Sequence, residues 1–149
     1  NTMLHLEHIN LVVDDLPGTL RFYQAAFPHW HIRTQGKGEW NGKPRTWLHL
    51  GDDYQYLAIS DHGEAENRDL DGHQVGLAHF AFVTSNLEGT IKRLEAAGFA
   101  IAKDGTEEPW RKNIYFIDPA GFEVEFVEYL SDLPTQRNFS SEESIGEAA

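Results

Sequence analysis

The sequence contains no cysteine, and this absence excludes three kinds of site. Without cysteine the chain can form no disulfide framework, no thiolate metal site and no cysteine nucleophile. The composition suits a reducing compartment, and we expect a cytoplasmic protein.

Basic residues are also scarce, with 12 Lys and Arg against 24 Asp and Glu, a formal net charge of −12. Nucleic-acid-binding proteins normally present a basic face, so we expect no nucleic-acid partner.

No apolar run approaches the roughly 18 residues that a membrane span needs, and the charge disfavours anionic membrane surfaces. We expect no signal peptide, since the first residues already have the pattern of a strand. A length of 149 residues allows one ordinary domain or two small fused modules.

One stretch of the chain occurs twice. The segment from His8 to Ala26, HINLVVDDLPGTLRFYQAA, recurs from His79 to Ala97 as HFAFVTSNLEGTIKRLEAA. Val12 corresponds to Val83, and a Gly-Thr pair stands at the same place in both copies. Two copies indicate a duplicated supersecondary unit rather than a repeat array.

Each copy predicts a strand followed by a helix. Short β-branched and aromatic runs predict strands at 4–13 and 77–84. Apolar residues at helical spacing predict helices at 15–27 and 86–97. Asp14 or Asp15 is the expected N-cap of the first helix and Ser85 or Asn86 that of the second, with Gly98 as a C-cap.

The remaining segments complete the same order of elements in both halves. Further strands are predicted at 31–34, 45–50 and 54–60, with a turn at 35–44, and then at 99–103, 113–117 and 122–129. The chain therefore divides into a first βαβββ module at 3–60, a connector at 61–76, a second βαβββ module at 77–130 and an acidic flexible tail at 131–149. The predicted fold class is α+β, with tandem βαβββ modules forming a cupped mixed sheet.

Three ionisable side chains of this pattern point to a metal. Strand alternation places His8 and His79 on equivalent faces of equivalent strands. Glu125 stands between Val124 and Phe126 in a strand that must pack, and a buried carboxylate needs a partner. Two imidazoles and one carboxylate form a set that holds a divalent ion and leaves coordination positions open.

The motifs LEHINLVV, LAHFAFV and YFIDPAGFEVEF resemble those of the vicinal oxygen chelate superfamily, also called the glyoxalase/bleomycin-resistance/extradiol-dioxygenase fold. The resemblance implies that His8, His79 and Glu125 are the metal ligands. It also places Tyr115 facing the cavity, where its hydroxyl would contact a substrate oxygen. Asn113, Arg111, Trp110 and Gln55 are the expected substrate-binding residues around it.

One position departs from the glyoxalase I pattern. That enzyme and the related epimerases typically carry a fourth ligand, Glu or Gln, in the last strand of the first module. Here the strand reads YQYLAIS, which has no carboxylate, and Gln55 is its one amide, with a register that the sequence leaves open. Three ligands are instead what extradiol dioxygenases and fosfomycin-type transferases present. The transferases also carry a basic cluster, for which Arg111, Lys112 and Arg45 are candidates.

The resemblance thus implies a divalent-metal-dependent enzyme that binds a small substrate through two adjacent oxygens. We favour Fe²⁺, with Mn²⁺, Zn²⁺ and Ni²⁺ as alternatives, and extradiol-dioxygenase-like ring cleavage as the reaction. A glyoxalase-type lyase or isomerase is the first alternative. A metal-free drug-binding protein like those of bleomycin resistance is the second. We expect a homodimer, with the site either within one chain or shared between two.

Overall fold

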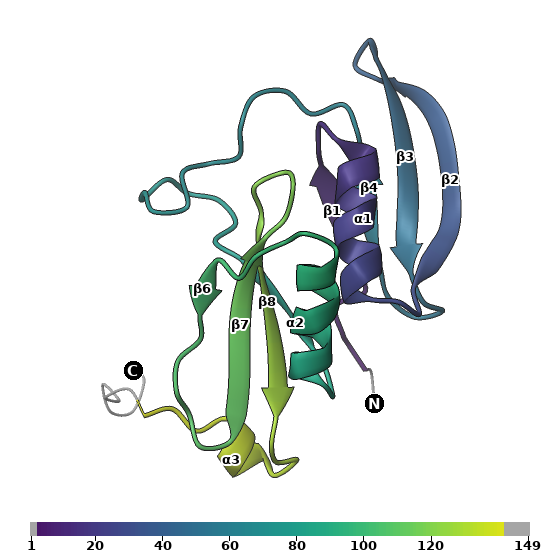
Figure 1. Ribbon diagram of the computed structural model, residues 1–149. Helices are drawn as coiled ribbons and strands as arrows, with labels where there is room; N and C mark the ends of the chain where they lie inside the picture. Colours follow the sequence, from purple (N-terminus) through teal and green to yellow (C-terminus); the bar gives the residue numbers. More distant parts are fainter. Residues whose placement is uncertain (1–2, 142–149) are drawn as a thin grey trace.

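In the computed structural model, which describes residues 3–141, the chain forms two βαβββ modules (Figure 1). The first consists of β1 (His8–Val12), α1 (Leu16–Ala26), β2 (His31–Trp40), β3 (Lys43–Gly51) and β4 (Tyr56–Ser60). The second consists of β5 (Phe80–Val83), α2 (Leu87–Ala96), β6 (Lys103–Asp104), β7 (Arg111–Ile117) and β8 (Glu123–Tyr129), and a short helix α3 (Pro134–Arg137) follows. The predicted α+β class and module order are confirmed.

Each module builds its own four-stranded mixed sheet with the same topology. The strand orders are β1-β4-β3-β2 and β5-β8-β7-β6. The first strand pairs in parallel with the last, and the other pairings are antiparallel. β1 and β5 are therefore edge strands, and the described residues do not join the two sheets into one.

The hairpin of β2 and β3 corrects one prediction. Residues 35–44 were predicted to form a turn, but β2 continues to Trp40 and β3 begins at Lys43. The turn consists of Asn41 and Gly42 alone, both with positive φ (46° and 83°), as a two-residue hairpin loop requires. The polar, glycine-containing sequence hid this edge strand because most of its residues are exposed and only cross-strand pairing defines it.

Five other strands are shorter than predicted. β1 begins at His8, β4 at Tyr56, β5 at Phe80 and β8 at Glu123, and β6 covers only Lys103–Asp104. The helix α3 lies in the segment predicted as a flexible tail, and residues 142–149 of that segment lie outside the described residues. No helix in the described part of the chain is long and apolar enough to cross a membrane.

Both helices are capped by side chains at equivalent positions. Asp15 Oδ1 accepts a hydrogen bond from Gly18 N, and Asn86 Oδ1 accepts one from Gly89 N, each at 3.0 Å. These bonds decide between the alternatives that the sequence left open at each cap. Gly98 follows α2 with φ of +94°, the left-handed conformation typical of a glycine C-cap.

The two modules pack through their helices, which lie next to each other in Figure 1. Arg93 of α2 donates hydrogen bonds to the carbonyls of Ala25 and Ala26 at the end of α1, each at 3.0 Å. Arg21 of α1 donates in return to the carbonyl of Ala97 at the end of α2. Each helix thus supplies a cation to the negative end of the other helix's dipole.

An aromatic core beneath these helices is shared by both modules. The ring of Phe22 on α1 makes edge contacts with Phe99 and Phe116 of the second module, with centroids 5.0 and 6.4 Å apart. The ring of Phe27 contacts Phe82 on β5 at 4.7 Å. Because Phe22 and Phe116 are fully buried, their apolar area binds the modules together.

A buried hydrogen bond also crosses from one module to the other. Tyr23 Oη on α1 donates to Asp118 Oδ2 in the β7–β8 turn at 2.6 Å, and both side chains are buried. Asp118 Oδ1 accepts from the backbone N–H groups of Ala120 and Phe122, each at 2.9 Å. One carboxylate therefore shapes the turn and anchors α1 to it.

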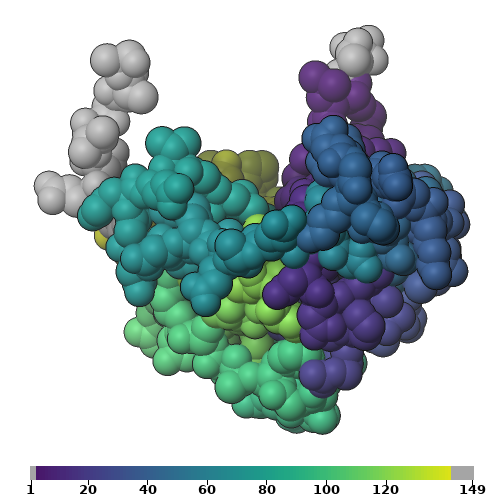
Figure 2. All heavy atoms as spheres, turned by 90° about the horizontal axis from the view of Figure 1, so that it is seen from above, coloured from purple at the N-terminus to yellow at the C-terminus, as the bar shows by residue number. Residues whose placement is uncertain are grey.

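The connector between the modules runs from β4 to β5 and lies over the second module (Figure 2). Asn67 Nδ2 in the connector donates to the carbonyl of Gly121 in the β7–β8 turn at 3.0 Å. Gly121 has φ of +89°, so the turn needs a residue that tolerates this conformation.

We expect Tyr23→Phe to lower the free energy of unfolding by about 1–3 kcal/mol, because it leaves a buried carboxylate oxygen without its donor. Urea denaturation of the two proteins measures this difference. Tyr54→Phe is the control, since Tyr54 is 80% exposed and its loss should leave stability unchanged. Equal stability of wild type and Tyr23→Phe would contradict the role given to this hydrogen bond.

The same pair predicts a pH dependence. Burial, followed by the charge of Asp118, raises the pKa of Tyr23 well above its ordinary value of 10.0. The protonated phenol therefore stabilises the folded state fully below pH 10, and this contribution is lost as pH rises beyond that value, because the unfolded chain ionises first. We expect the stability difference between wild type and Tyr23→Phe to shrink above pH 10 in denaturation series at several pH values. A difference that grows with pH would contradict this reading.

Candidate metal centre

A row of side chains crosses the face of the second sheet that the helices leave uncovered. The strand register aligns Ala81 on β5 with Glu125 on β8, Tyr115 on β7 and Lys103 on β6. His79 directly precedes β5 and belongs to the same face by alternation. The small side chain of Ala81 leaves space above Glu125.

Two of the three predicted ligands meet on this face. His79 Nε2 lies 3.1 Å from Glu125 Oε1, and Asn113 Nδ2 donates to Glu125 Oε2 at 3.1 Å. Glu125 is only 15% exposed, so the carboxylate predicted to need a partner has two. Two donor atoms bound to one ion at about 2.1 Å would lie about 3 Å apart, so this pair fits a divalent cation.

A second carboxylate faces the other nitrogen of His79. Glu123 Oε2 lies 3.6 Å from His79 Nδ1, and Glu123 Oε1 lies 3.1 Å from Lys103 Nζ. A carboxylate at Nδ1 favours the tautomer whose Nε2 lone pair is free, and this is the nitrogen that faces Glu125.

Tyr115 lies between these groups, with its ring edge-on to His79 at 5.4 Å and the Lys103 ammonium 4.3 Å above the ring. Burial, then the charge of Glu125, raises the pKa of the Tyr115 phenol above its ordinary value. At neutral pH the hydroxyl therefore keeps its proton and can donate a hydrogen bond.

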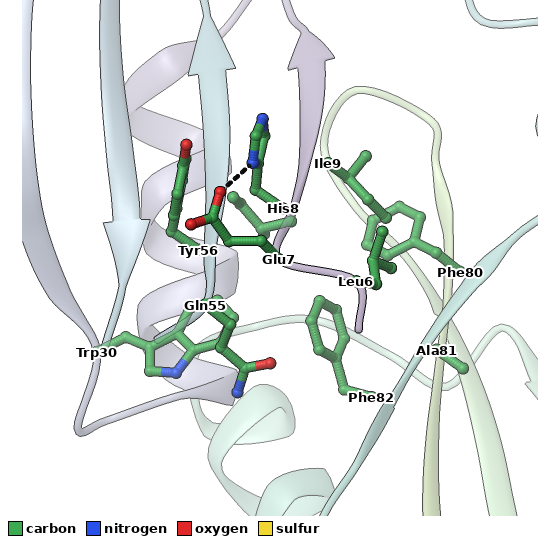
Figure 3. A pocket seen from close by; sticks show the side chains of 11 residues that line it. Leu6, Glu7, His8, Ile9, Trp30, Gln55, Tyr56, Phe80, Ala81 and Phe82 are labelled. Atoms are coloured by element: carbon green, nitrogen blue, oxygen red, sulfur yellow. Dashed lines mark hydrogen bonds and ion pairs between the residues drawn. The ribbon is translucent and has the colours of Figure 1, made fainter. Parts of the chain in front are cut away.

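The third predicted ligand, His8, belongs to the other sheet. Its ring stacks on Tyr56 of β4 with centroids 4.5 Å apart, and Glu7 Oε1 lies 2.8 Å from its Nδ1 (Figure 3). Nε2 of His8 is thereby left free, as it is in His79. Among residues 3–141 no group of three or more metal-ligating side chains assembles, so one chain does not bring His8 to His79 and Glu125.

The register shows which residue of the first sheet corresponds to Glu125. Asn10 pairs with Ala58 in the first sheet as Ala81 pairs with Glu125 in the second, and Asn10 and Ala81 are equivalent in the repeat. Ala58 therefore occupies the position equivalent to Glu125 and offers no donor atom. Gln55 precedes β4 in the turn from Asp52, outside this face register.

The other predicted substrate-binding residues have partners of their own. Arg111 Nη1 donates to the carbonyl of Phe139 at 2.8 Å, and its Nη2 lies 3.8 Å from Glu108. The carbonyl of Trp110 accepts from Leu130 N, and about a third of Trp110 is exposed. Asn113 contacts the carboxylate of Glu125, as described above, rather than open space.

A pocket of about 380 Å³ lies between the edge strands β1 and β5 (Figure 3). Leu6, Ile9, Phe80 and Phe82 give it apolar walls, and His8 and Gln55 also line it. His79 and Glu125 do not, so this hollow is not the candidate metal centre of a single chain. It marks instead the unpaired edges of both sheets.

Sequence reasoning missed the supporting residues of both histidines. Glu123 was detectable, because strand alternation places it on the face of Glu125 two residues later. Recognising Ala58 as the counterpart of Glu125 required the strand register of both sheets. Glu7 adjoins His8 in sequence, but adjacent strand residues point to opposite faces, and only the exposed start of the strand lets their side chains meet.

Comparisons with known proteins agree with this fold. The crystal structure of a glyoxylase/bleomycin resistance protein/dioxygenase domain from Frankia sp. EAN1pec matches with a TM-score of 0.69 and 22% identity, over 86% of this chain and 99% of that one. A glyoxalase family protein from Bacillus cereus matches with a TM-score of 0.70 and 12% identity, over 88% and 97%. At these identities the likeness shows the fold alone.

The fosfomycin resistance protein FosX from Listeria monocytogenes is a further structural neighbour. A mutant of this protein in complex with Mn(II) and dihydroxypropylphosphonic acid matches with a TM-score of 0.66 and 20% identity, over 91% of this chain and 98% of that one. A comparison with proteins of curated function found no match. The sequence profile of one family matches residues 5–126, which is most of the chain. The chain belongs to the Glyoxalase/Bleomycin resistance protein/Dioxygenase superfamily.

Proposed function

We propose that this protein is a divalent-metal enzyme whose site contains His79 and Glu125 of one chain and His8 of a second copy. The observation that carries the proposal is the convergence of His79 Nε2 and Glu125 Oε1 at 3.1 Å, while the third candidate, His8, stands on the edge strand of the other sheet. A mononuclear site of two imidazoles and one carboxylate needs all three.

The free edges of the sheets support a second copy as the source of His8. Exposed apolar residues lie on or beside both edges, with Leu6 75%, Val12 47% and Val83 64% exposed. Edge strands with exposed apolar side chains are normally covered. A twofold dimer that sets β1 of one chain beside β5 of the other would cover both edges at once and form two equivalent sites.

In this proposal His8, His79 and Glu125 would hold a divalent ion, and the ion would supply Lewis-acid polarisation of two neighbouring oxygens of a small substrate. Glu7 lies 2.8 Å from Nδ1 of His8 and Glu123 lies 3.6 Å from Nδ1 of His79, so both imidazoles would present Nε2 to the ion. Asn113 orients the Glu125 carboxylate through its amide. Tyr115 keeps its phenolic proton and donates it in a hydrogen bond to a substrate oxygen, because burial and Glu125 raise its pKa.

Extradiol-type ring cleavage is the reaction we propose to test first. Because Ala58 offers no fourth ligand, the ion would keep enough open coordination positions for a bidentate diol and for dioxygen. Oxygen uptake with catechols under Fe(II) tests this reaction directly. Turnover of a methylglyoxal–thiol adduct under Ni(II) or Zn(II), without oxygen uptake, would instead identify the glyoxalase type.

We expect wild-type protein, reconstituted anaerobically with mixed divalent ions and desalted, to retain about one ion per chain by mass spectrometry. His8→Ala and Glu125→Ala should each lose it, because each removes one of three ligands. His29→Ala, an exposed histidine in the α1–β2 loop, is the control and should retain the ion. An ion-free wild type would overturn the metal site and favour a metal-free drug-binding protein.

Mixing the two defective chains tests whether the site is shared. A dimer of one His8→Ala chain and one Glu125→Ala chain contains one intact site and one doubly defective site, so random co-assembly should restore about one ion per four chains. A site within one chain predicts no recovery. Absence of recovery in mixtures that form dimers would contradict the shared site while leaving the ligands themselves in place.

We further expect Glu123→Gln to weaken metal binding by about 10- to 100-fold, because the carboxylate that faces His79 Nδ1 is lost. Competition with a chelating dye measures the affinity. Glu88→Gln is the matched control, since Glu88 also lies near a lysine, Lys92 at 3.6 Å, but on the exposed face of α2. Unchanged affinity in Glu123→Gln would show that this carboxylate does not position the imidazole.

A further inference from the structure

The side chain of Asn113 lies beside the candidate metal centre and has one atom without a hydrogen-bond partner. Asn113 Nδ2 donates to Glu125 Oε2 at 3.1 Å, while the amide oxygen Oδ1 is buried and accepts no hydrogen bond from any described residue. A buried acceptor without a donor costs about 1–3 kcal/mol, and such groups are rare in folded proteins. The amide therefore keeps an orientation that is unfavourable for its own oxygen.

The carboxylate of Glu125 gives the reason for this orientation. If the amide were turned over, its oxygen would face Glu125 Oε2, and two acceptors would meet with no proton between them. The observed orientation gives Oε2 a donor and leaves Oε1 facing His79 Nε2 at 3.1 Å. Asn113 thus engages one carboxylate oxygen and leaves the other for the ion.

Gly105 borders the same amide on its other side. The last residue pair of β6 and β7 joins Asp104 to Ile114, so Gly105 follows directly opposite Asn113. Residues directly opposite each other on antiparallel strands point to one face of the sheet. A Cβ at Gly105 would overlap the amide oxygen, the Cγ and the backbone carbonyl of Asn113, so no side chain fits there while the amide keeps its place.

The requirement for glycine at position 105 is spatial. Gly98 and Gly121 have positive φ, but Gly105 does not, so a left-handed backbone is not the reason for a glycine. The three atoms nearest to a Cβ at this position all belong to Asn113. Gly105 therefore makes room for one neighbour, whose side chain contacts a proposed metal ligand.

The first module has a glycine at the matching place. Two residues after Ala58 on β4, the partner on β3 is Trp47, and Gly36 on β2 pairs with Trp47. Two residues after Glu125, the counterpart of Ala58, the partner on β7 is Asn113. A Cβ at Gly36 would come within 2.8 Å of the Trp47 ring. Both modules thus use a glycine to let this side chain lie across the neighbouring strand, but only in the second does the side chain bind a carboxylate.

We propose that Gly105 and Asn113 form a positioning pair for the metal ligand Glu125. The missing side chain at Gly105 fixes the Asn113 amide, and the amide holds Glu125 with Oε1 toward the ion. Both residues act through Glu125 and do not themselves hold the ion. The inference rests on the proposed function, whereas the contacts among the three residues lie within one chain and are present without metal.

The first test is the ¹H–¹⁵N NMR signal of the Asn113 side-chain amide in the metal-free, full-length chain. We expect Gly105→Ala to shift this signal, because the added methyl group displaces the amide from Glu125. Gly38→Ala is the matched control, since Gly38 on β2 also lacks a positive φ and a Cβ there would meet no atom within 4 Å. An unmoved signal in Gly105→Ala would overturn the proposed pair.

The second test measures Zn²⁺ affinity by competition with a chelating dye. We expect Gly105→Ala and Asn113→Ala each to weaken Zn²⁺ binding by about tenfold or more, as the loss of a group that orients a metal ligand typically does. The double variant should bind no more weakly than Asn113→Ala alone, because Gly105 acts through the amide that this variant lacks. Gly38→Ala should bind Zn²⁺ like the wild type.

The double variant also guards against a folding defect. If Gly105→Ala does not fold, recovery of the fold in the double variant would support the collision with Asn113, and continued misfolding would overturn it. Additive losses of affinity would show that Gly105 supports the fold rather than the amide. Equal Zn²⁺ affinity of the wild type and both single variants would overturn this inference alone, whereas a wild type that binds no Zn²⁺ would overturn the proposed function with it.

Discussion

The packing of α1 against α2 is the constraint on which the other features of this protein depend. Each helix end is held by an arginine from the other helix, and the Tyr23–Asp118 hydrogen bond and the shared aromatic core hold the modules below them. Because the modules are joined through their helix-bearing sides, the outer edges of strands β1 and β5 stay unpaired. The same packing separates His8 from His79 and Glu125, so it makes a second copy necessary for the metal site we propose.

The two histidines illustrate how the duplication supplies half-sites that are alike in chemistry and different in detail. Both present Nε2, and both have a carboxylate near Nδ1, at 2.8 Å for His8 and 3.6 Å for His79. The carboxylates come from different places, one from the preceding residue and one from a neighbouring strand. The two imidazoles therefore have similar surroundings at Nδ1 through unrelated local contacts.

The two modules have diverged at equivalent positions of their sheets. Ala58 in the first sheet corresponds to Glu125 in the second. Arg45, which donates a hydrogen bond to Ser60, corresponds to Arg111, which lies 3.8 Å from Glu108. In our proposal the second module therefore supplies the carboxylate of the metal site together with one histidine, and the first module supplies a histidine alone.

The sequence by itself determined the module order and the faces of the strands, because these depend on periodicity, and it narrowed the N-cap of each helix to two candidates. It also selected His79 and Glu125 as candidate ligands and named the superfamily that the profile match confirms. Only the tertiary structure decided that β2 extends through a glycine-containing segment, that Ala58 takes the position equivalent to Glu125 and that Arg111 has a carboxylate near it. These features depend on strand register and on which surfaces remain uncovered, and both follow from contacts between residues far apart in the chain, which a local pattern does not encode.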